Sequence, residues 1–509
     1  MDLSAKYQKK TDKQHVLDNP DTYIGSVETV DATHWMMEGE RIQQNTHLFV
    51  PGLFKLFDEA IVNCRDHVVR MASVNPVSYI DVDITEDGTL SFTNDGDGID
   101  VAMHPEHQVY IPELIFGHLR TSTNYDKSEK KIVGGKNGFG VKLIFIWSTE
   151  GHIETVDATR KLKYTQSFTN NLDKISKPKI TSYSKKSYTK ITFKPDYKRL
   201  GLDGLNDTMR KVFIRRIYDI AAVTDKKVKV SYNGTVVPVR TFPQYIDLYI
   251  GPKEERARVS ETQDRWEYSV CLGVDEFTHI SFVNGIHTSK GGKHVEYIMN
   301  QITRKLVAHI KLKKKIDVKP STLKEQMMLF LHCSIENPGF DSQTKEFMTT
   351  PASSFGSTCE VSDKFIEKIA SKTGLGLMDI ALTLTQAKES VQAKKQDGTK
   401  TKTIRGIPKL VDANYAGTAK SHQCTLILCE GDSAKAGVLS GLSKEDRNYY
   451  GVYPLKGKLM NVRDEASKKI HDNTEIHELK QIIGLEKDHE YTDEDIRSKL
   501  RYSKVLFIT

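Results

Sequence analysis

The sequence lacks any apolar run that approaches the roughly 18 uninterrupted residues of a membrane span. Its N-terminus, MDLSAKYQKKTDKQHV, carries charge but no apolar signal region, so secretion and membrane insertion are disfavoured. Cysteine is scarce too: six residues are scattered without CxxC spacing, and Cys424 with Cys429 lacks the second pair that a zinc site needs. We therefore expect reduced, buried thiols and an intracellular protein.

Proline and glycine, at 15 and 33 residues, are too few for a fibrous or disordered chain. Apolar residues make up 38% and charged residues 28% of the 509 positions, so sizeable cores can form. At about 100 to 200 residues per domain, this length predicts about three to five domains. The net charge of +7 does not by itself indicate a binding partner, unless the excess charge is concentrated in one place.

The first part of the chain shows a helix, a hairpin and a glycine-rich connection in that order. From residue 51, PGLFKLFDEAIVNCRDHVVRM places apolar residues at helical spacing after a proline suited to a first turn. From residue 78, SYIDVDITEDGTLSFTNDGDGI predicts a β-hairpin that ends in a Gly- and Asp-rich loop. Residues 117–140 are polar and contain five glycines, which predicts a long mobile connection. The order favours an α/β sandwich.

A second α/β unit is expected after a boundary near residue 250. Strand-like residues 279–286, a helix over 294–312 and strand-like residues 327–338 predict a crossover unit, followed by a helix from 363 to about Lys388. The Lys- and Thr-rich stretch 388–403 has the composition of a solvated linker. A third segment begins at residue 424 with CTLILCEGDSA, a buried-strand pattern that leads into an acidic loop.

Three short patterns could carry chemistry. Glu59 and Asn63 lie four apart and share one face of the predicted helix, although such a pair is usually an ordinary surface feature. The loop NDGDG at 94–98 could contact a purine edge, although alone it is a common turn. The run GGKNGFG at 134–140 could bring backbone N–H groups to phosphates, but it lacks the GK[ST] ending of a P-loop and is weak evidence alone.

The order of these patterns resembles the Bergerat-type ATPase superfamily, and within it the eukaryotic and viral form of type IIA DNA topoisomerase. Further stretches resemble that family in the family's order and cover essentially the whole chain: TYIGS from 22, GHLRTSTNYD from 117, YTKITFKPD from 188, FVNGIHTSKGGKHV from 282, IENPGFDSQTKE from 335, IPKLVDANYAG from 407, LILCEGDSAKAG from 426 and YPLKGKLMNVRD from 453.

The resemblance implies an ATP site with Mg²⁺. Glu59 resembles the general base that orients water, Asn63 the amide ligand of the nucleotide's Mg²⁺, and Asn94 the residue that reads adenine. Gln343 and Lys345 resemble the pair that reaches the γ-phosphate from the second domain, where a fixed cation stabilises developing charge. The other implied nucleotide-binding residues are Ser122, Thr123 and Asn124 near ribose and phosphate, and Lys136, Asn137, Gly138, Phe139, Gly140 and Lys142 around the triphosphate.

DNA contacts and a second metal site are also implied. Residues 304–319 contain seven Lys or Arg against one Asp, a pattern that is usually only a solvated face. The resemblance places Lys313, Lys314 and Lys315 where captured double-stranded DNA passes, and phosphate neutralisation needs no base readout. Glu430, followed by Asp432 and Ser433, resembles the first acidic Mg²⁺ ligand of a Toprim fold. Lys456, Lys458 and Arg463 would lie near the DNA backbone.

The implied fold class is α/β (α+β). It comprises a Bergerat-type ATPase sandwich with an N-terminal strap over 1–250, an α/β transducer domain with a right- or left-handed crossover over 251–388, a linker over 389–420 and an incomplete Toprim domain over 421–509. The implied enzyme passes one DNA duplex through a double-strand break in another and dimerises through its ATPase gate when ATP is bound. The location stays open between the nucleus and a virus-infected host cell.

The last residues, KVLFIT, resemble the strand that the family's DxD metal ligands follow, and the family's catalytic tyrosine comes later. We therefore expect ATP hydrolysis and DNA capture, but no DNA cleavage by this chain unaided. Three alternatives remain: a chaperone or mismatch-repair clamp, a bacterial gyrase B subunit, and a non-enzymatic DNA clamp. The first shares the ATPase motifs but not QTKE, EGDSA and PLKGK, and the long linker and FDSQTKE argue against the second.

Overall fold

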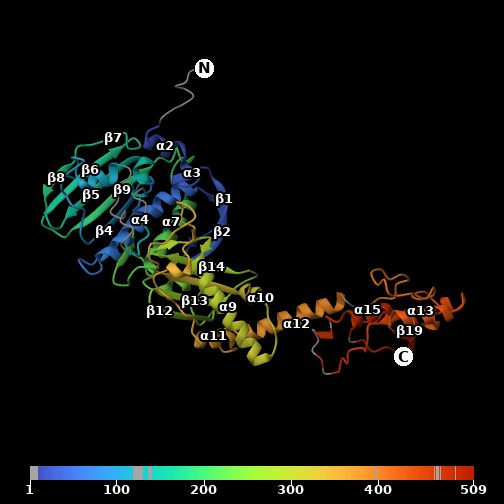
Figure 1. Cartoon of the computed structure of the whole chain (residues 1–509). Coiled ribbons are helices and arrows are strands. Elements are labelled where there is room, and N and C mark those ends of the chain that lie inside the picture. The colour runs from blue at the N-terminus through green and yellow to red at the C-terminus, as the bar shows by residue number, and fades with distance from the viewer. Residues whose placement is uncertain are drawn as a thin grey trace, which may run out of the picture. The chain divides into compact units, whose positions relative to one another are not determined.

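The computed structural model describes residues 10–118, 130–135, 140–274, 276–395, 398–463, 465, 469–470, 472–487 and 489–508. It divides into two compact units, residues 1–378 and 379–509, each with its own hydrophobic core (Figure 1). The predicted mixed α/β architecture is confirmed in both units.

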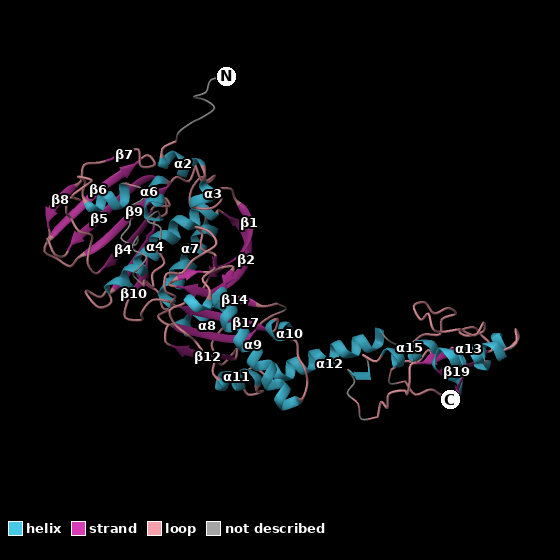
Figure 2. Ribbon diagram, viewed as in Figure 1, coloured by secondary structure: helices cyan, strands magenta, loops and turns pink. Residues whose placement is uncertain are grey.

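The first 250 residues form a layer of helices against a nine-stranded sheet (Figure 2). The strand order is β11-β10-β3-β4-β9-β5-β6-β7, with β8 also paired to β6, and only β3 and β10 run parallel. A separate hairpin, β1 and β2, packs on α7 and α8. The strands are β1 (Val30–Glu38), β2 (Arg41–Phe49), β3 (Tyr79–Ile84), β4 (Leu90–Asp95), β5 (Ser148–Asp157), β6 (Leu162–Thr169), β7 (Lys174–Ile175), β8 (Lys179–Ser182), β9 (Tyr188–Pro195), β10 (Lys229–Tyr232) and β11 (Thr235–Val236).

The helices of this part are α2 (Asp12–Asp18), α3 (Pro20–Tyr23), α4 (Pro51–Met71), α5 (Ile111–Gly117), α6 (Gly140–Ile146), α7 (Asp207–Ala222) and α8 (Phe242–Ile250). The predicted helix from residue 51 is therefore confirmed as α4, with Pro51 in its first turn. The predicted hairpin is confirmed as β3 and β4, which pair antiparallel. The side chain of Asn206 accepts a hydrogen bond from the N–H of Met209 (2.8 Å) and so caps α7.

The remainder of the first unit surrounds a five-stranded sheet of order β12-β13-β17-β14-β15. Strands β14 and β17 are parallel and α9 lies between them in sequence, so the predicted crossover unit is confirmed. The elements are β12 (Arg258–Gln263), β13 (Trp266–Leu272), β14 (Thr278–Val283), β15 (Ile286–His287), β16 (Gly291–Gly292), α9 (Lys293–Lys314), α10 (Pro320–Lys324), β17 (Met327–Cys333), β18 (Phe347–Met348), the 3-10 helix η1 (Ala352–Ser354), α11 (Asp363–Ala370) and α12 (Leu377–Lys395).

The helix predicted from residue 363 to about Lys388 is two helices, α11 and α12. The chain turns between them at residues 371–376, where Gly376 adopts a φ of +67°, a conformation that L side chains rarely adopt. Helix α12 then runs on to Lys395, into the stretch predicted as a linker, because Ala, Gln, Glu and Lys are good helix formers even without an apolar face.

The second unit contains a three-stranded parallel sheet of order β20-β19-β21. Part of the predicted linker over 389–420 belongs to its core, since Ile407, Ala413 and Ala416 are buried there. The predicted strands at 425 and at the chain's last residues are confirmed as β19 and β21. The elements are η2 (Ser421–Gln423), β19 (Thr425–Glu430), α13 (Gly431–Gly441), η3 (Asp446–Asn448), β20 (Tyr450–Leu455), α15 (Thr474–Ile483), α16 (Asp493–Lys499) and β21 (Lys504–Ile508).

All six cysteines are buried and unpaired, as predicted. Among the described helices, none has both the length and the apolar character needed to span a bilayer. The boundary near residue 250 stays a prediction, because residues 1–378 cluster as one compact unit.

Candidate functional site

A cavity of about 360 Å³ in the first unit brings together residues from six separate segments. Apolar residues of α5, α6 and β9 form part of its wall, which suits a flat base, and polar groups line the rest. Seven residues predicted from sequence lie on it: Glu59 and Asn63 from α4, Asn94 from β4, Gly140 and Lys142 from α6, and Gln343 and Lys345 from the loop before β18.

Glu59 lies between two lysines. Its Oε1 atom is 2.5 Å from Nζ of Lys55 and 3.4 Å from Nζ of Lys345, and all three residues are buried. Burial by itself would raise the pKa of Glu59, but the two ammonium groups outweigh it and lower the pKa to about 2. Glu59 is therefore ionised at neutral pH and can accept a hydrogen bond from water.

Lys345 comes to the pocket from a segment 286 residues away in sequence. Its backbone adopts a φ of +60°, which is uncommon outside glycine, and its Nζ atom also donates to the carbonyl of Gly134 (3.3 Å). Burial opposes the charged form, yet the carboxylates of Glu59, Asp58 and Asp66 raise the pKa of Lys345. The loop thus holds a protonated amine inside the pocket.

The base of the glycine-rich loop is anchored to α4 by Asp66. Its buried carboxylate accepts hydrogen bonds from the N–H groups of Gly134 (2.8 Å) and Gly135 (2.8 Å). At the other end of the loop, a Cβ on Gly140 would lie 1.8 Å from Oε2 of Glu59, so only glycine fits there. Helix α4 therefore sets both ends of the loop relative to its own acid.

The residues fit a metal nucleotide through amide groups. The Nδ2 atom of Asn63 donates to the carbonyl of Glu59 (2.6 Å), which leaves its side-chain oxygen available to a cation. The Nδ2 atom of Asn94 donates to the carbonyl of Asp95 (2.9 Å), which leaves its side-chain oxygen available to an amino group. Because the described residues contain no group of three or more His, Cys, Asp or Glu side chains that could hold a metal, Mg²⁺ would depend on phosphate oxygens and water here.

Lys142 contributes a second cation to the pocket from α6. Lys142 is only 2% exposed, and burial lowers the pKa of its amine to about 8. The predicted residues Ser122, Thr123, Asn124, Lys136, Asn137, Gly138 and Phe139 lie outside the described residues.

The NDGDG loop contains both residues that line the cavity and residues that hold its own conformation. Asp95 is fully buried and accepts hydrogen bonds from the N–H groups of Ser78 (2.7 Å) and Tyr79 (3.1 Å). A Cβ on Gly98 would lie 1.9 Å from the carbonyl oxygen of Val156. The acid and this glycine therefore hold the turn, while Asn94 faces the cavity.

Sequence reasoning missed Lys55, Asp66, His67 and Arg70. Lys55 holds Glu59, Asp66 anchors the loop, and His67 and Arg70 line the cavity. Burial is the main reason that the pKa of His67 falls to about 4, so its ring is neutral. The spacing of these residues from Glu59, by four, seven, eight and eleven positions on one helix, is the signal that could have identified them.

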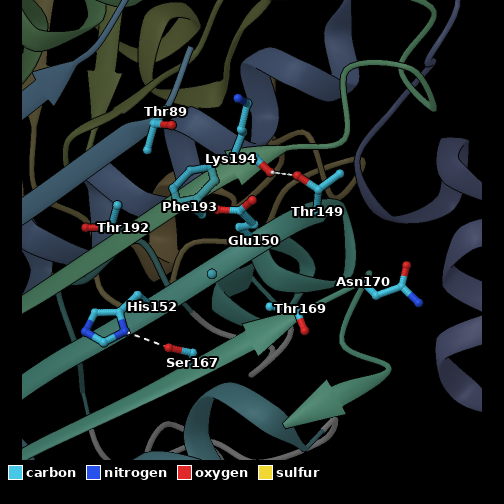
Figure 3. Close-up of a pocket in the computed structure, with 11 residues that line it drawn as sticks. Thr89, Thr149, Glu150, His152, Ser167, Thr169, Asn170, Thr192, Phe193 and Lys194 are labelled. Atoms are coloured by element: carbon cyan, nitrogen blue, oxygen red, sulfur yellow. Dashed lines mark hydrogen bonds between the residues drawn. The ribbon is translucent and has the colours of Figure 1, made fainter. Parts of the chain in front are cut away.

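Two other cavities lack this combination of groups. One, of about 430 Å³, lies over β5, β6 and β9 and is lined by several Thr and Ser side chains, with Glu150 and Lys194 as its charged residues (Figure 3). There the Nδ1 atom of His152 is 3.0 Å from the hydroxyl of Ser167. The other, of about 680 Å³, lies between α9 and residues 352–360. Neither contains an acid flanked by buried cations.

In the second unit, the structure places predicted residues at one edge of the small sheet. Glu430 ends β19 and is exposed, and its register partner is Leu455, the last residue of β20. Lys456 and Lys458 follow directly and are exposed, and so is Arg463. The carboxyl ends of two parallel strands thus carry an acid and cations side by side, the usual position of a site in such sheets.

The predicted DNA-contacting lysines lie at the end of α9. Lys313 and Lys314 occupy its last turn, and Lys315 follows in a left-handed conformation with a φ of +57°. All three are exposed, and no ion pair joins them to a described residue. Their neighbour Lys311 pairs with Asp317 (2.9 Å).

Comparison with known proteins gives a consistent result. The DNA gyrase B family model matches residues 240–399. DNA topoisomerase 2 of Acanthamoeba polyphaga mimivirus is 44% identical over 518 residues, which cover 99% of this chain and 40% of the relative. The chain therefore spans less than half the length of that relative.

Two solved structures match about three quarters of the chain. The ATPase region of Saccharomyces cerevisiae topoisomerase II is 43% identical, with a TM-score of 0.70, and the match covers 75% of this chain and 100% of that structure. The ATPase and transducer domains of DNA topoisomerase II from Balamuthia mandrillaris are 39% identical, with a TM-score of 0.71, covering 77% of this chain and 100% of that structure.

Proposed function

Since this chain belongs to the type IIA DNA topoisomerase family, we propose that its first unit binds and hydrolyses ATP in the cavity beside α4. The observation that carries the proposal is Glu59, a buried carboxylate held between Lys55 and Lys345. A carboxylate beside fixed cations is the arrangement that water-driven cleavage of a phosphoanhydride needs.

Each residue then has a role. The apolar wall receives adenine, with Asn94 contacting its edge, and the N–H groups of the glycine-rich loop approach the phosphates. Glu59 orients a water molecule toward the γ-phosphate and accepts its proton. Gln343 and Lys345 contact the γ-phosphate and stabilise the charge that develops there. Asn63 would hold Mg²⁺, which neutralises phosphate charge when bound.

The whole protein's activity follows from the family. ATP binding would close a dimeric gate formed by two copies of the first unit, and hydrolysis would reopen it. The dimer would pass one DNA duplex through a break in another. Lys313, Lys314 and Lys315 would contact the captured duplex, since exposed cations neutralise phosphate without reading bases. Glu430 would contribute to the Mg²⁺ site for cleavage, together with acids that the described residues do not group around it.

Glu59→Gln tests the ATPase proposal, because it keeps the shape of the side chain and removes its basicity. We expect ATP turnover to fall by about 10² to 10⁴-fold while ATP binding persists. Turnover is measured by phosphate release and binding by calorimetry. Glu150→Gln, in the cavity over β5, is the matched control and should leave both unchanged. Unaltered hydrolysis by Glu59→Gln would remove the general-base role, whereas binding without turnover by the wild-type chain would favour a non-enzymatic clamp.

A further inference from the structure

We propose that Asn284 is a positioning residue for ATP hydrolysis, because its carboxamide ties the stem of the glycine-rich loop to the segment that carries Lys345. The stem is defined as residues 130–135. This inference rests on the proposed function and deepens it, since it identifies what holds two parts of the site in register.

Asn284 lies in the turn between β14 and β15 and is fully buried. Its Nδ2 atom donates to the carbonyls of Val133 (3.2 Å) and Ile335 (2.9 Å), and its Oδ1 atom accepts from the N–H of Ile335 (2.9 Å). Its own N–H donates to the carbonyl of Cys333 (3.0 Å). Every side-chain bond therefore goes to backbone, and the bonds go to two different segments.

The stem is bound on both sides. One residue beyond Val133, the N–H of Gly134 donates to Asp66 of α4. On its other side, the N–H of Asn337 donates to the carbonyl of Lys131 (2.9 Å), and a Cβ on Gly134 would lie 3.1 Å from the side chain of Ile286. The stem thus has little freedom while Asn284 and Asp66 both hold it.

The second segment leads directly to the cation of the site. Ile335 follows β17, and the chain continues from it through residues 336–344 to Lys345. Lys345 then returns to the stem, since its Nζ atom donates to the carbonyl of Gly134 (3.3 Å). The bonds of Asn284 and Lys345 close a ring of contacts, so a displacement of the stem also displaces the amine beside Glu59.

Only a carboxamide can make these bonds, because it supplies an N–H₂ donor and a carbonyl acceptor in one plane. A carboxylate at this position could not donate, and a hydroxyl could not reach both partners. Asn284 also adopts a φ of +51°, a conformation that glycine tolerates without strain. Asn284→Gly therefore removes the carboxamide and leaves the turn conformation accessible.

The chain contains a matched control at Asn233. It too precedes a glycine in a hairpin turn, with a φ of +46°, and its carboxamide also bonds both backbone groups of one residue, Ile84 (2.8 and 3.2 Å). Neither Asn233 nor Ile84 lines the cavity of Glu59. Asn233→Gly removes a comparable pair of bonds that involves neither the stem nor the segment carrying Lys345.

The experiment compares both variants of the 509-residue chain with the wild type. For Asn284→Gly we expect kcat for ATP to fall by about tenfold to a hundredfold with a smaller change in KM, because a misplaced group costs rate more than affinity. Hydrogen exchange should accelerate at the amides of 130–135 and 335–345 together. Asn233→Gly should change neither quantity. With Lys345→Met already present, Asn284→Gly should add little to the loss of rate.

An unchanged kcat in Asn284→Gly, or an equal loss in Asn233→Gly, would overturn the positioning role. Faster hydrogen exchange confined to one of the two segments would contradict the proposal that Asn284 connects them. A wild-type chain that turns over no ATP would instead overturn the proposed function, and the exchange measurement would then still decide whether Asn284 joins the segments. Thermal unfolding of each variant shows whether the fold is retained.

Discussion

At the scale of single residues, the site depends on charge that burial makes strong. Lys55, Glu59 and Lys345 are each less than a tenth exposed, so their mutual interactions are weakly screened by water. An unpaired charge in such a place would be costly, and each of the three has a partner of opposite sign. The arrangement holds Glu59 ionised and Lys345 protonated before any nucleotide arrives.

Replacing Lys345 should separate hydrolysis from binding. In Lys345→Met we expect turnover to fall by about 10² to 10³-fold, because a fixed cation that stabilises developing charge is lost. The affinity for ATP should change much less. Phosphate-release assays and calorimetry measure the two quantities. Lys290→Met, which removes an exposed amine paired with Glu346 (2.9 Å), serves as the control. Equal rates in the two variants would exclude Lys345 from the chemistry.

Lys142 should make nucleotide binding depend on pH. Since burial lowers the pKa of its amine to about 8, the charged form that attracts phosphate is lost as pH rises through that value. If binding needs the ammonium group, affinity for a non-hydrolysable ATP analogue falls about tenfold from pH 7 to pH 9. Bound phosphate favours the charged form, so binding should take up protons near pH 8. Lys142→Met should bind more weakly with a flat profile over this range, and an unchanged slope would contradict the assignment.

At the scale of elements, α4 joins the site to the rest of the first unit. Asp58 precedes Glu59 on this helix and points elsewhere, toward the fully buried Arg216 of α7 (2.7 Å). Arg216 also donates to the carbonyl of Gly285 (2.7 Å), next to Asn284. Neighbouring residues of one helix thus contact the pocket and the five-stranded part of the unit, because successive side chains point about 100° apart.

Breaking the contact between α4 and α7 should destabilise the first unit. In Arg216→Met we expect the free energy of unfolding to fall by about 3 to 5 kcal/mol, because Asp58 is left buried without its partner. Denaturant unfolding monitored by circular dichroism measures the change. Arg41→Met, whose guanidinium forms an exposed pair with Glu255 (3.6 Å), should cost less than about 1 kcal/mol. Similar losses in both variants would mean that the buried pair contributes no more than a surface one.

At the scale of the whole molecule, the chain combines a candidate nucleotide pocket with a second candidate site. The first unit gathers acid, amides and cations, whereas Glu430 in the second unit belongs to no group of three or more His, Cys, Asp or Glu side chains that could hold a metal among the described residues. The chain spans 40% of the length of its mimiviral relative. From the groups that line the cavity beside α4, we expect ATP turnover by this chain.

The lysines at the end of α9 should couple this turnover to DNA. Replacing Lys313, Lys314 and Lys315 together by Ala should weaken stimulation of ATPase activity by double-stranded DNA, with basal turnover unchanged. The slope of log affinity against log salt should decrease by up to about 3, since each phosphate contact contributes about 0.9. Replacing the exposed Lys226, Lys227 and Lys229 removes the same charge elsewhere. Equal effects of the two triple variants would mean that the α9 lysines make no specific contact with DNA and are only a solvated surface.

Local patterns predicted much of this fold. The helix from Pro51, the hairpin before NDGDG and the crossover around α9 were predictable because each depends on side-chain periodicity and nearby turn residues. The break between α11 and α12 was harder to predict, because residues that favour a helix resume directly after Gly376. Buried residues of the predicted linker, such as Ile407, were also missed, since burial there depends on strands far along the chain.

By itself, the sequence determined the order of its motifs, which singled out Glu59, Asn63 and Asn94 as candidates. The family resemblance then predicted nucleotide-site roles for these three and for Gln343 and Lys345. Only the tertiary structure decided their electrostatic state and their mechanical connections. Lys55 and Lys345 reach the same carboxylate from positions 290 residues apart, and Asn284 joins two segments that no local pattern links. Charge interactions and hydrogen bonds act over a few ångströms, so they depend on distances that only folding sets.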